Sequence, residues 1–227
     1  MSAPESGSAH GATPPQQPAS VRAQILATEH WSLLATRSMT WSEVMSRIVI
    51  HLTVLSASLV VLALAAQVNG FGMAFRVLAI GLAAAALVLG TLTGLRVHNA
   101  SADDAAMLIG MNRLRSAYVA MDSGIEPYLV TSQHDDAAGL MASYLMGTHR
   151  STLSHVMGST SMFINVVNAI VAGTLGAIVA WVAGGPAWVI ATIGAASGLT
   201  YLGVVVAVAR RTFSGDAVQS RFPTPKA

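Results

Sequence analysis

The chain contains no cysteine, which excludes disulfides, thiol nucleophiles and cysteine-based metal sites. Charged residues are also scarce: they make up 10% of the 227 residues, whereas an average soluble domain has about 25%. Lysine occurs once and no basic run is longer than Arg210-Arg211, so a nucleic-acid partner is not expected. Four long apolar runs contain no Asp, Glu, Lys or Arg. The shortage of charge is therefore greatest where hydrophobic residues gather.

The four apolar runs cover residues 48–68, 77–95, 162–183 and 187–209. Each is close to the ~20 residues that a helix needs to cross about 30 Å of hydrocarbon. Because a bilayer offers no water to the backbone, such runs cross it as helices. The sequence therefore predicts an all-α, polytopic membrane protein whose four transmembrane helices form two hairpins, at residues 48–95 and 161–209.

Basic residues are distributed unevenly about these predicted crossings. Eleven of the twelve fall in the two termini or in the segment between the hairpins, and only Arg76 falls in a link on the opposite side. Positive charge concentrates in cytoplasmic loops, so both termini and residues 96–160 are predicted to be cytoplasmic. Arginine outnumbers lysine eleven to one, which indicates a GC-rich bacterial source. We therefore expect the chain in the lipid bilayer of a bacterial plasma membrane.

The segments outside the hairpins are predicted to be tails and short helices. Residues 1–19 are rich in Ser, Ala, Pro and Gly, which is typical of a disordered tail. Residues 210–227 form a second, cytoplasmic tail that is predicted to be disordered from residue 214. Residues 20–47 contain an amphipathic helix, cytoplasmic or interfacial. We predict a break before Thr40-Trp41-Ser42-Glu43, a capping box that opens the next helix.

Residues 96–160 are predicted to be a cytoplasmic helical segment. Ser101 is followed by Asp103 and Asp104 in a pattern that caps the start of a helix. The apolar residues after it step by three or four positions, which indicates one amphipathic face. A second capping pattern begins at Ser132 and predicts another short helix through residues 140–145. These helices would pack on each other, on residues 21–37 or on the membrane surface.

Residue types that suit metal binding or catalysis are present, but their spacing does not favour either. His134-Asp135-Asp136 and Asp103-Asp104 contain possible ligand atoms, yet adjacent residues on a helix point to different faces. Aspartate in a first helical turn already caps backbone amides and complements the helix dipole. The sequence has no glycine-rich phosphate loop, HExxH or GxSxG pattern. We therefore expect no catalytic, cofactor-binding or metal-ligating residue and no enzyme.

Three polar residues inside the apolar runs are candidates for contacts between helices. His51 lies near the cytoplasmic end of the first crossing, and Asn165 and Asn168 share one face of the third. Polar groups inside a membrane face other helices or line a path, because lipid cannot hydrogen-bond to them. We expect hydrogen bonding between helices to be their main use.

Glycines mark two helix faces for close packing. Gly90 and Gly94 form a GxxxG motif in the second crossing, and Gly194 and Gly198 form another in the fourth. Small residues let helix backbones approach closely in a membrane. Such faces either close the four-helix bundle within one chain or build a homo-oligomer.

Three stretches resemble motifs of an uncharacterised family of bacterial integral membrane proteins that is frequent in actinobacteria. They are residues 25–34 (ILATEHWSLL), 110–115 (GMNRLR) and 130–136 (VTSQHDD). The resemblance implies a shared architecture: an amphipathic N-terminal helix, two crossings, a cytoplasmic segment and two more crossings. That family has no established activity, so the resemblance assigns no functional residue. Asp122-Ser123-Gly124 departs from the Pro-Glu-type turn of the family.

Two functional hypotheses follow from these features. The first is a non-enzymatic membrane scaffold that binds a cytoplasmic protein partner through polar and aromatic residues outside the membrane, namely Glu29, Trp31, Asn112, Arg113 and Arg115. The alternative is an oligomeric channel or small-solute permease. In that case the Asn165/Asn168 face or the Thr91/Thr93 face would line the path, since uncharged groups suffice for a pore.

Overall fold

The computed structural model describes residues 18–146, 158–213 and 220–225, and within these residues the fold is all-helical. The elements follow the order α1 (Ala19–Asn69), α2 (Met73–Met121), η1 (Ser123–Tyr128, a 3-10 helix), α3 (Ala137–Leu145), α5 (Thr160–Val182) and α6 (Ala187–Phe213). The helices α1, α2, α5 and α6 are each long and apolar enough to cross a membrane. The predicted fold class is thus confirmed in its helical content and in the number of candidate spans.

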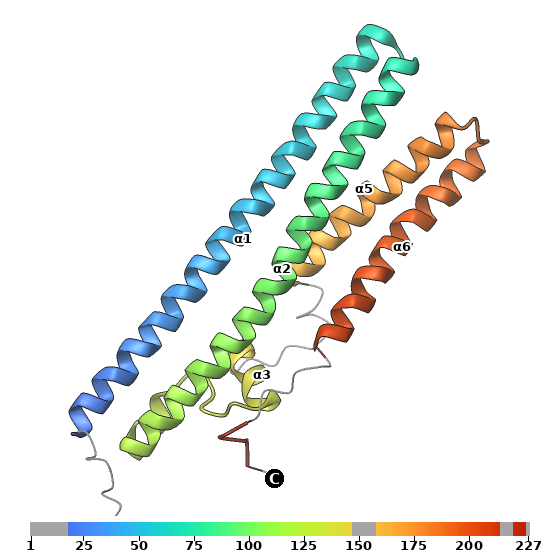
Figure 1. The fold of residues 1–227 in the computed structure, drawn as a ribbon. Helices are drawn as coiled ribbons and strands as arrows, with labels where there is room; N and C mark the ends of the chain where they lie inside the picture. The colour runs from blue at the N-terminus through green and yellow to red at the C-terminus, as the bar shows by residue number, and fades with distance from the viewer. Residues whose placement is uncertain (1–17, 147–157, 214–219, 226–227) are drawn as a thin grey trace, which may run out of the picture.

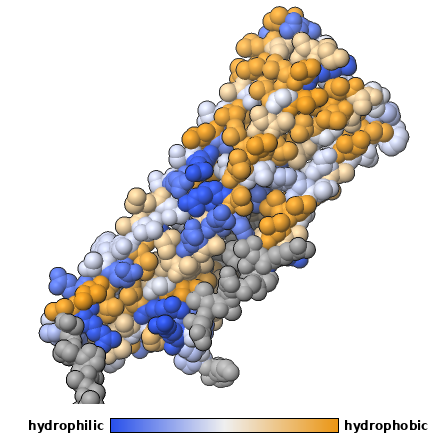
Figure 2. Space-filling view, viewed as in Figure 1, coloured by the Kyte–Doolittle hydropathy of each residue, from blue (hydrophilic) through white to orange (hydrophobic). Residues whose placement is uncertain are grey.

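The four long helices lie in a row (Figure 1): α1 packs along α2, α2 along α5, and α5 along α6. We call residues 48–95 and 160–209 the apolar end, and residues 19–47, 96–146 and 220–225 the polar end. Apolar side chains predominate over the upper part of the molecule in Figure 2, and hydrophilic ones are more frequent from its middle downward. Only α1 and α2 extend through both ends.

The helix α1 runs without interruption for 51 residues, so the predicted break before Thr40 is wrong. No glycine or proline occurs between its ends, and the side that meets α2 repeats at steps of three and four residues, as in coiled coils. This side includes His30, Leu33, Arg37 and Trp41. Packing against α2 therefore continues through the segment that resembled a helix start. Gly70 ends the helix at φ +58°, a left-handed conformation that favours glycine.

The helix α2 is also continuous, over 49 residues, so the predicted helix start at Ser101–Asp104 is wrong. The Ser101 hydroxyl donates to Val97 O (2.9 Å), a bond within the helix. Asp104 is buried against α1 instead of capping a terminus. Leu33 packs over Gly110, where an added Cβ would lie 3.2 Å from Leu33 Cδ1. Close contact with α1 thus extends well beyond the apolar end.

A second short helix is present, as predicted, but it begins later than its predicted cap. The cap of α3 is Asp136, whose carboxylate accepts a hydrogen bond from Gly139 N (2.8 Å). Ser132 accepts a bond from His134 N (3.0 Å) in the preceding loop.

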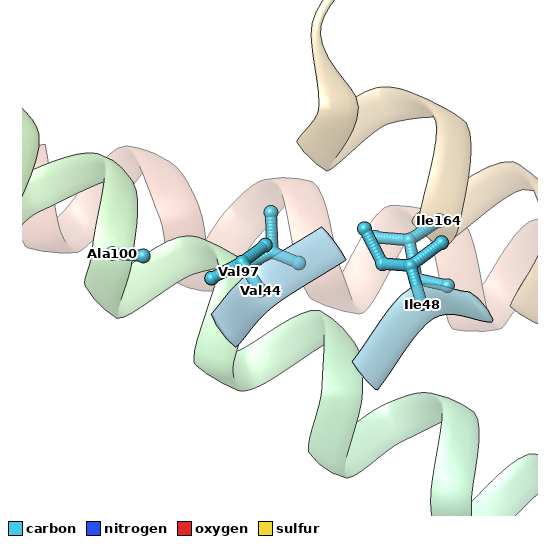
Figure 3. Close-up of a cluster of buried hydrophobic side chains, with 5 residues drawn as sticks. All are labelled: Val44, Ile48, Val97, Ala100 and Ile164. Atoms are coloured by element: carbon cyan, nitrogen blue, oxygen red, sulfur yellow. The ribbon is translucent and has the colours of Figure 1, made fainter. Parts of the chain in front are cut away.

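A buried apolar cluster lies where α1, α2 and α5 meet. Val44 and Ile48 from α1, Val97 and Ala100 from α2, and Ile164 from α5 point toward one another (Figure 3). Four of these side chains are completely inaccessible, and Ile48 is 6% exposed. Burial of a large aliphatic side chain stabilises a fold by about 1.5–3 kcal/mol in water. This cluster packs α5 against α1 and α2, at the boundary between the apolar and polar ends.

Candidate functional site

The polar residues predicted inside the apolar runs come together at one place, which we call the Gly90 junction. His51 of α1 and Asn168 of α5 both lie against Gly90 of α2, and both side chains are buried. A Cβ added at Gly90 would overlap Asn168 Oδ1 and lie 2.7 Å from His51 Cε1. Only glycine leaves room for these two side chains on the α2 backbone.

Gly94 and Asn165 extend the Gly90 junction by one helical turn. A Cβ added at Gly94 would lie 3.1 Å from Asn165 Oδ1. The two ring nitrogens of His51 and both side-chain polar atoms of Asn168 have no hydrogen-bond partner among the described residues. The side chains of His51 and Asn168 nevertheless meet at Gly90, and the expectation that they bond between helices stays a prediction. The first GxxxG motif leaves space on α2 in which polar side chains of α1 and α5 pack.

The second GxxxG motif packs α6 on α5. A Cβ at Gly194 would lie 3.1 Å from both Gly173 O and Ala177 Cβ, and one at Gly198 would lie 2.8 Å from Ala169 O. Both GxxxG faces are thus occupied by helices of the same chain. A homo-oligomer would have to use other faces.

The polar end contains a buried ionic cluster that sequence reasoning missed, here called the Asp104 cluster. The Asp104 carboxylate is 2% exposed. It accepts hydrogen bonds from Arg37 Nε (2.6 Å), Trp41 Nε1 (2.8 Å) and the Tyr144 hydroxyl (3.0 Å). These donors come from α1 and α3, so one carboxylate joins three helices. The sequence could have indicated this cluster through the three-and-four spacing on α1, because that spacing places Arg37 and Trp41 on the side that meets α2.

The five residues predicted to bind a partner divide into two groups. Asn112, Arg113 and Arg115 make internal contacts. The Asn112 amide donates to His134 O (2.7 Å) and accepts from Arg115 Nη1 (2.8 Å) and the Ser143 hydroxyl (2.9 Å). Arg113 Nε donates to Asp135 Oδ2 (2.7 Å). These residues hold α3 and its preceding loop on α2.

Glu29 and Trp31, the other two, are exposed on α1. Trp31 is 71% exposed, an unusual state for a side chain that is mostly apolar. Two positions along a helix differ by about 200° around its axis, so these side chains point to nearly opposite sides. A single small interface would include one of them and not the other.

Residues 220–225, which we call the C-terminal strap, lie against the start of α3. This docking corrects the prediction that the tail is disordered throughout. Asp135 accepts hydrogen bonds from Arg221 N (2.9 Å), Phe222 N (2.7 Å) and the Ser220 hydroxyl (2.6 Å), and Asp135 N donates to Phe222 O (3.2 Å). Asp136 accepts from Thr224 N (2.7 Å) and the Thr224 hydroxyl (2.9 Å). The predicted disordered residues 1–17 and 214–219 lie outside the described residues.

Charge in the polar end is stabilised by these contacts. Burial opposes ionisation of Asp135, but hydrogen bonds from Arg221 N, Ser220 and Arg113 outweigh it and hold the pKa of Asp135 well below its usual range. Burial raises the pKa of the Tyr144 hydroxyl, and the Asp104 carboxylate raises it further. Tyr144 is therefore a neutral donor and Asp135 a charged acceptor at physiological pH.

The residues considered as metal ligands do not form one site. In the described part of the chain, no three His, Asp or Glu side chains gather closely enough to hold an ion. Asp104 and Asp135 direct their oxygens at the protein donors given above. The acidic residues in this region thus have structural roles.

A cluster of aromatic side chains lies at the tip of the apolar end, farthest from the polar end. Phe71 and Phe75 pack edge-on against each other and against Trp181 of α5. The Arg76 guanidinium lies 4.7 Å from the centre of the Trp181 ring, where the ring face attracts a cation. Arg76 of α2 therefore contacts α5 and links α1 and α2 to α5 and α6.

Comparisons with models of known protein families, with curated proteins and with solved structures found no match to the chain. The resemblance to a bacterial membrane family stays a prediction.

Proposed function

We propose that the chain is a membrane-anchored docking protein without enzymatic activity, which presents a stiff helical arm to a protein partner. One observation carries the proposal: α1 and α2 continue together beyond the apolar end for about 40 Å at 1.5 Å per residue. The buried Asp104 cluster fixes them to each other and to α3. An arm whose helices are joined through one buried carboxylate keeps a defined shape.

The outer surface of this arm supports a protein partner. Trp31 and Leu34 are both exposed and lie three residues apart, hence on one side of α1. Water-exposed tryptophan and leucine side chains on one face are typical of an interaction surface. Tryptophan is also among the residues that contribute most to binding energy in interfaces.

The position of the asparagines supports this proposal over the alternative of a channel. Asn165 and Asn168 are buried between α1, α2 and α5, so they do not line an open path within the chain. The remaining support is electrostatic: eleven of twelve basic residues lie on one side of the spans. This asymmetry favours a plasma-membrane protein of bacterial origin whose arm and termini are in the cytoplasm.

A photo-crosslinking amino acid at position 31 tests the docking proposal in native membranes. We expect a discrete protein adduct from Trp31, and we expect Leu34→Glu to abolish it because the two side chains share a face. Leu59 is a matched control, since it is equally apolar and exposed but lies in the apolar end. Protein adducts from position 59 with none from position 31 would contradict the proposal, and an adduct of twice the chain mass would identify a second copy as the partner.

A further inference from the structure

We propose that Asp135 and Asp136 form a binding site for an extended peptide segment and that the C-terminal strap fills this site within the chain. A segment of a partner protein with the same chemistry then replaces the strap. The proposal names a second contact for the docking function above, and depends on that function for its partner. The residues of the strap indicate which kind of partner segment the site would bind.

The two carboxylates are held in position by groups that do not belong to the strap. Asp135 is buried and receives Arg113 Nε at 2.7 Å. Asp136 caps α3 through Gly139 N at 2.8 Å. Asn112 fixes the loop before them by donating to His134 O. The site is therefore organised by α2 and α3, and an organised site loses less entropy when a segment binds.

Most of the bonds to the strap are made by its backbone. Arg221 N, Phe222 N and Thr224 N donate to the two carboxylates, and Phe222 O accepts from Asp135 N. Sequence preference comes from two hydroxyl groups four positions apart, those of Ser220 and Thr224. The matching ligand is an extended segment with Ser or Thr at these two positions. Backbone bonds give affinity in this mode, and a few side chains give specificity.

The strap is suited to exchange because it buries little apolar surface. Arg221 and Pro223 are exposed, and Phe222 is 42% exposed. A weak ligand can still occupy its site when it is tethered, because the tether gives it an effective concentration of about a millimolar. A free segment that makes the same bonds competes when it reaches that concentration, or below it if it makes additional contacts.

Two spin labels in the full chain test whether the strap occupies and leaves this site. The absence of cysteine allows labels at Ala138→Cys on α3 and Pro225→Cys on the strap, both exposed positions. Pulsed electron resonance should give one short distance. Asp135→Asn should lower the ratio of short to long distances about tenfold or more, because charge-assisted bonds are lost. Asp122→Asn is the matched control, since the Asp122 carboxylate accepts only a local bond from Gly124 N (2.9 Å) among the contacts described.

A synthetic peptide with the sequence of residues 218–227 then tests binding from outside the chain. We expect millimolar peptide to convert the short distance into long ones, and a peptide carrying Ser220→Val and Thr224→Val to need at least about tenfold more. A short distance that persists in ten-millimolar peptide would overturn the proposal, as would an unchanged distance in the Asp135→Asn chain. Neither result depends on the Trp31 adduct, so the peptide site and the docking function can fail separately.

Discussion

Replacing Asp104 by asparagine is the perturbation whose effect follows most directly from the structure. Asparagine keeps the shape and can still accept the Trp41 bond, but it removes the charge that pairs with Arg37 Nε at 2.6 Å. Breaking a buried ion pair costs about 3–5 kcal/mol. Arg37 remains 30% exposed and can turn partly to water, so we expect a loss of about 2–3 kcal/mol. This corresponds to an increase of about 30- to 150-fold in local opening.

Hydrogen–deuterium exchange of the intact protein measures this opening residue by residue. Protection should fall in residues 19–47 of α1 and in α3, and it should be unchanged in α6, which does not contact the cluster. Asp103 is the control, because its side chain is 61% exposed and lies 3.7 Å from Arg96. Asp103→Asn should change exchange by no more than about fivefold, since surface pairs contribute about 0–1 kcal/mol. Equal effects of the two substitutions would refute the claim that the Asp104 cluster fixes the arm.

Three further outcomes are expected. Gly90→Ala should destabilise the protein by about 1–3 kcal/mol in thermal unfolding, because its Cβ would overlap Asn168 Oδ1. Gly81→Ala, with nothing within 4 Å of an added Cβ, should be neutral or stabilising, and equal shifts would contradict the packing at the Gly90 junction. Asn112→Ala should lower the free energy of unfolding by about 2–3 kcal/mol and raise hydrogen exchange in α3 but not in α5. A uniform loss of protection would be inconsistent with the role of Asn112 in holding α3 on α2. Hydrogen bonds from Arg221 N, Ser220 and Phe222 N of the strap contribute to the low pKa of Asp135. The strap should therefore be fully docked above pH ~5, and its docking should weaken progressively as the pH falls below about 4. In the spin-label distances, release on raising the pH from 5 to 8 would contradict this sign.

The apolar end was predictable because charge and polarity are rare there. Apolar runs of about 20 residues must be helices in a membrane, and His51, Asn165 and Asn168 stand out against them. Their meeting at Gly90 could not be predicted, since the relative rotation of three helices depends on packing between them. The sequence supplied the members of the Gly90 junction but not their contact.

The polar end was predictable only in part, because the same residue types cap helices and bind across them. Ser101 and Asp104 form a plausible cap, yet Asp104 pairs with Arg37, 67 positions earlier in the chain. Asp135 likewise contacts a strap that begins 85 positions later. Such contacts bury an aspartate that local spacing assigns to the surface. A search for uninterrupted three-and-four spacing from His30 to His51 would have predicted the continuous α1.

Native mass spectrometry of the gently solubilised protein tests the docking function most directly. The account predicts a complex of the chain with a second protein that is retained in the Leu59→Ser chain and lost when Trp31 and Leu34 are replaced by serine. A ring of four or more identical chains that survives the Trp31 and Leu34 substitutions would contradict it and favour an oligomeric channel.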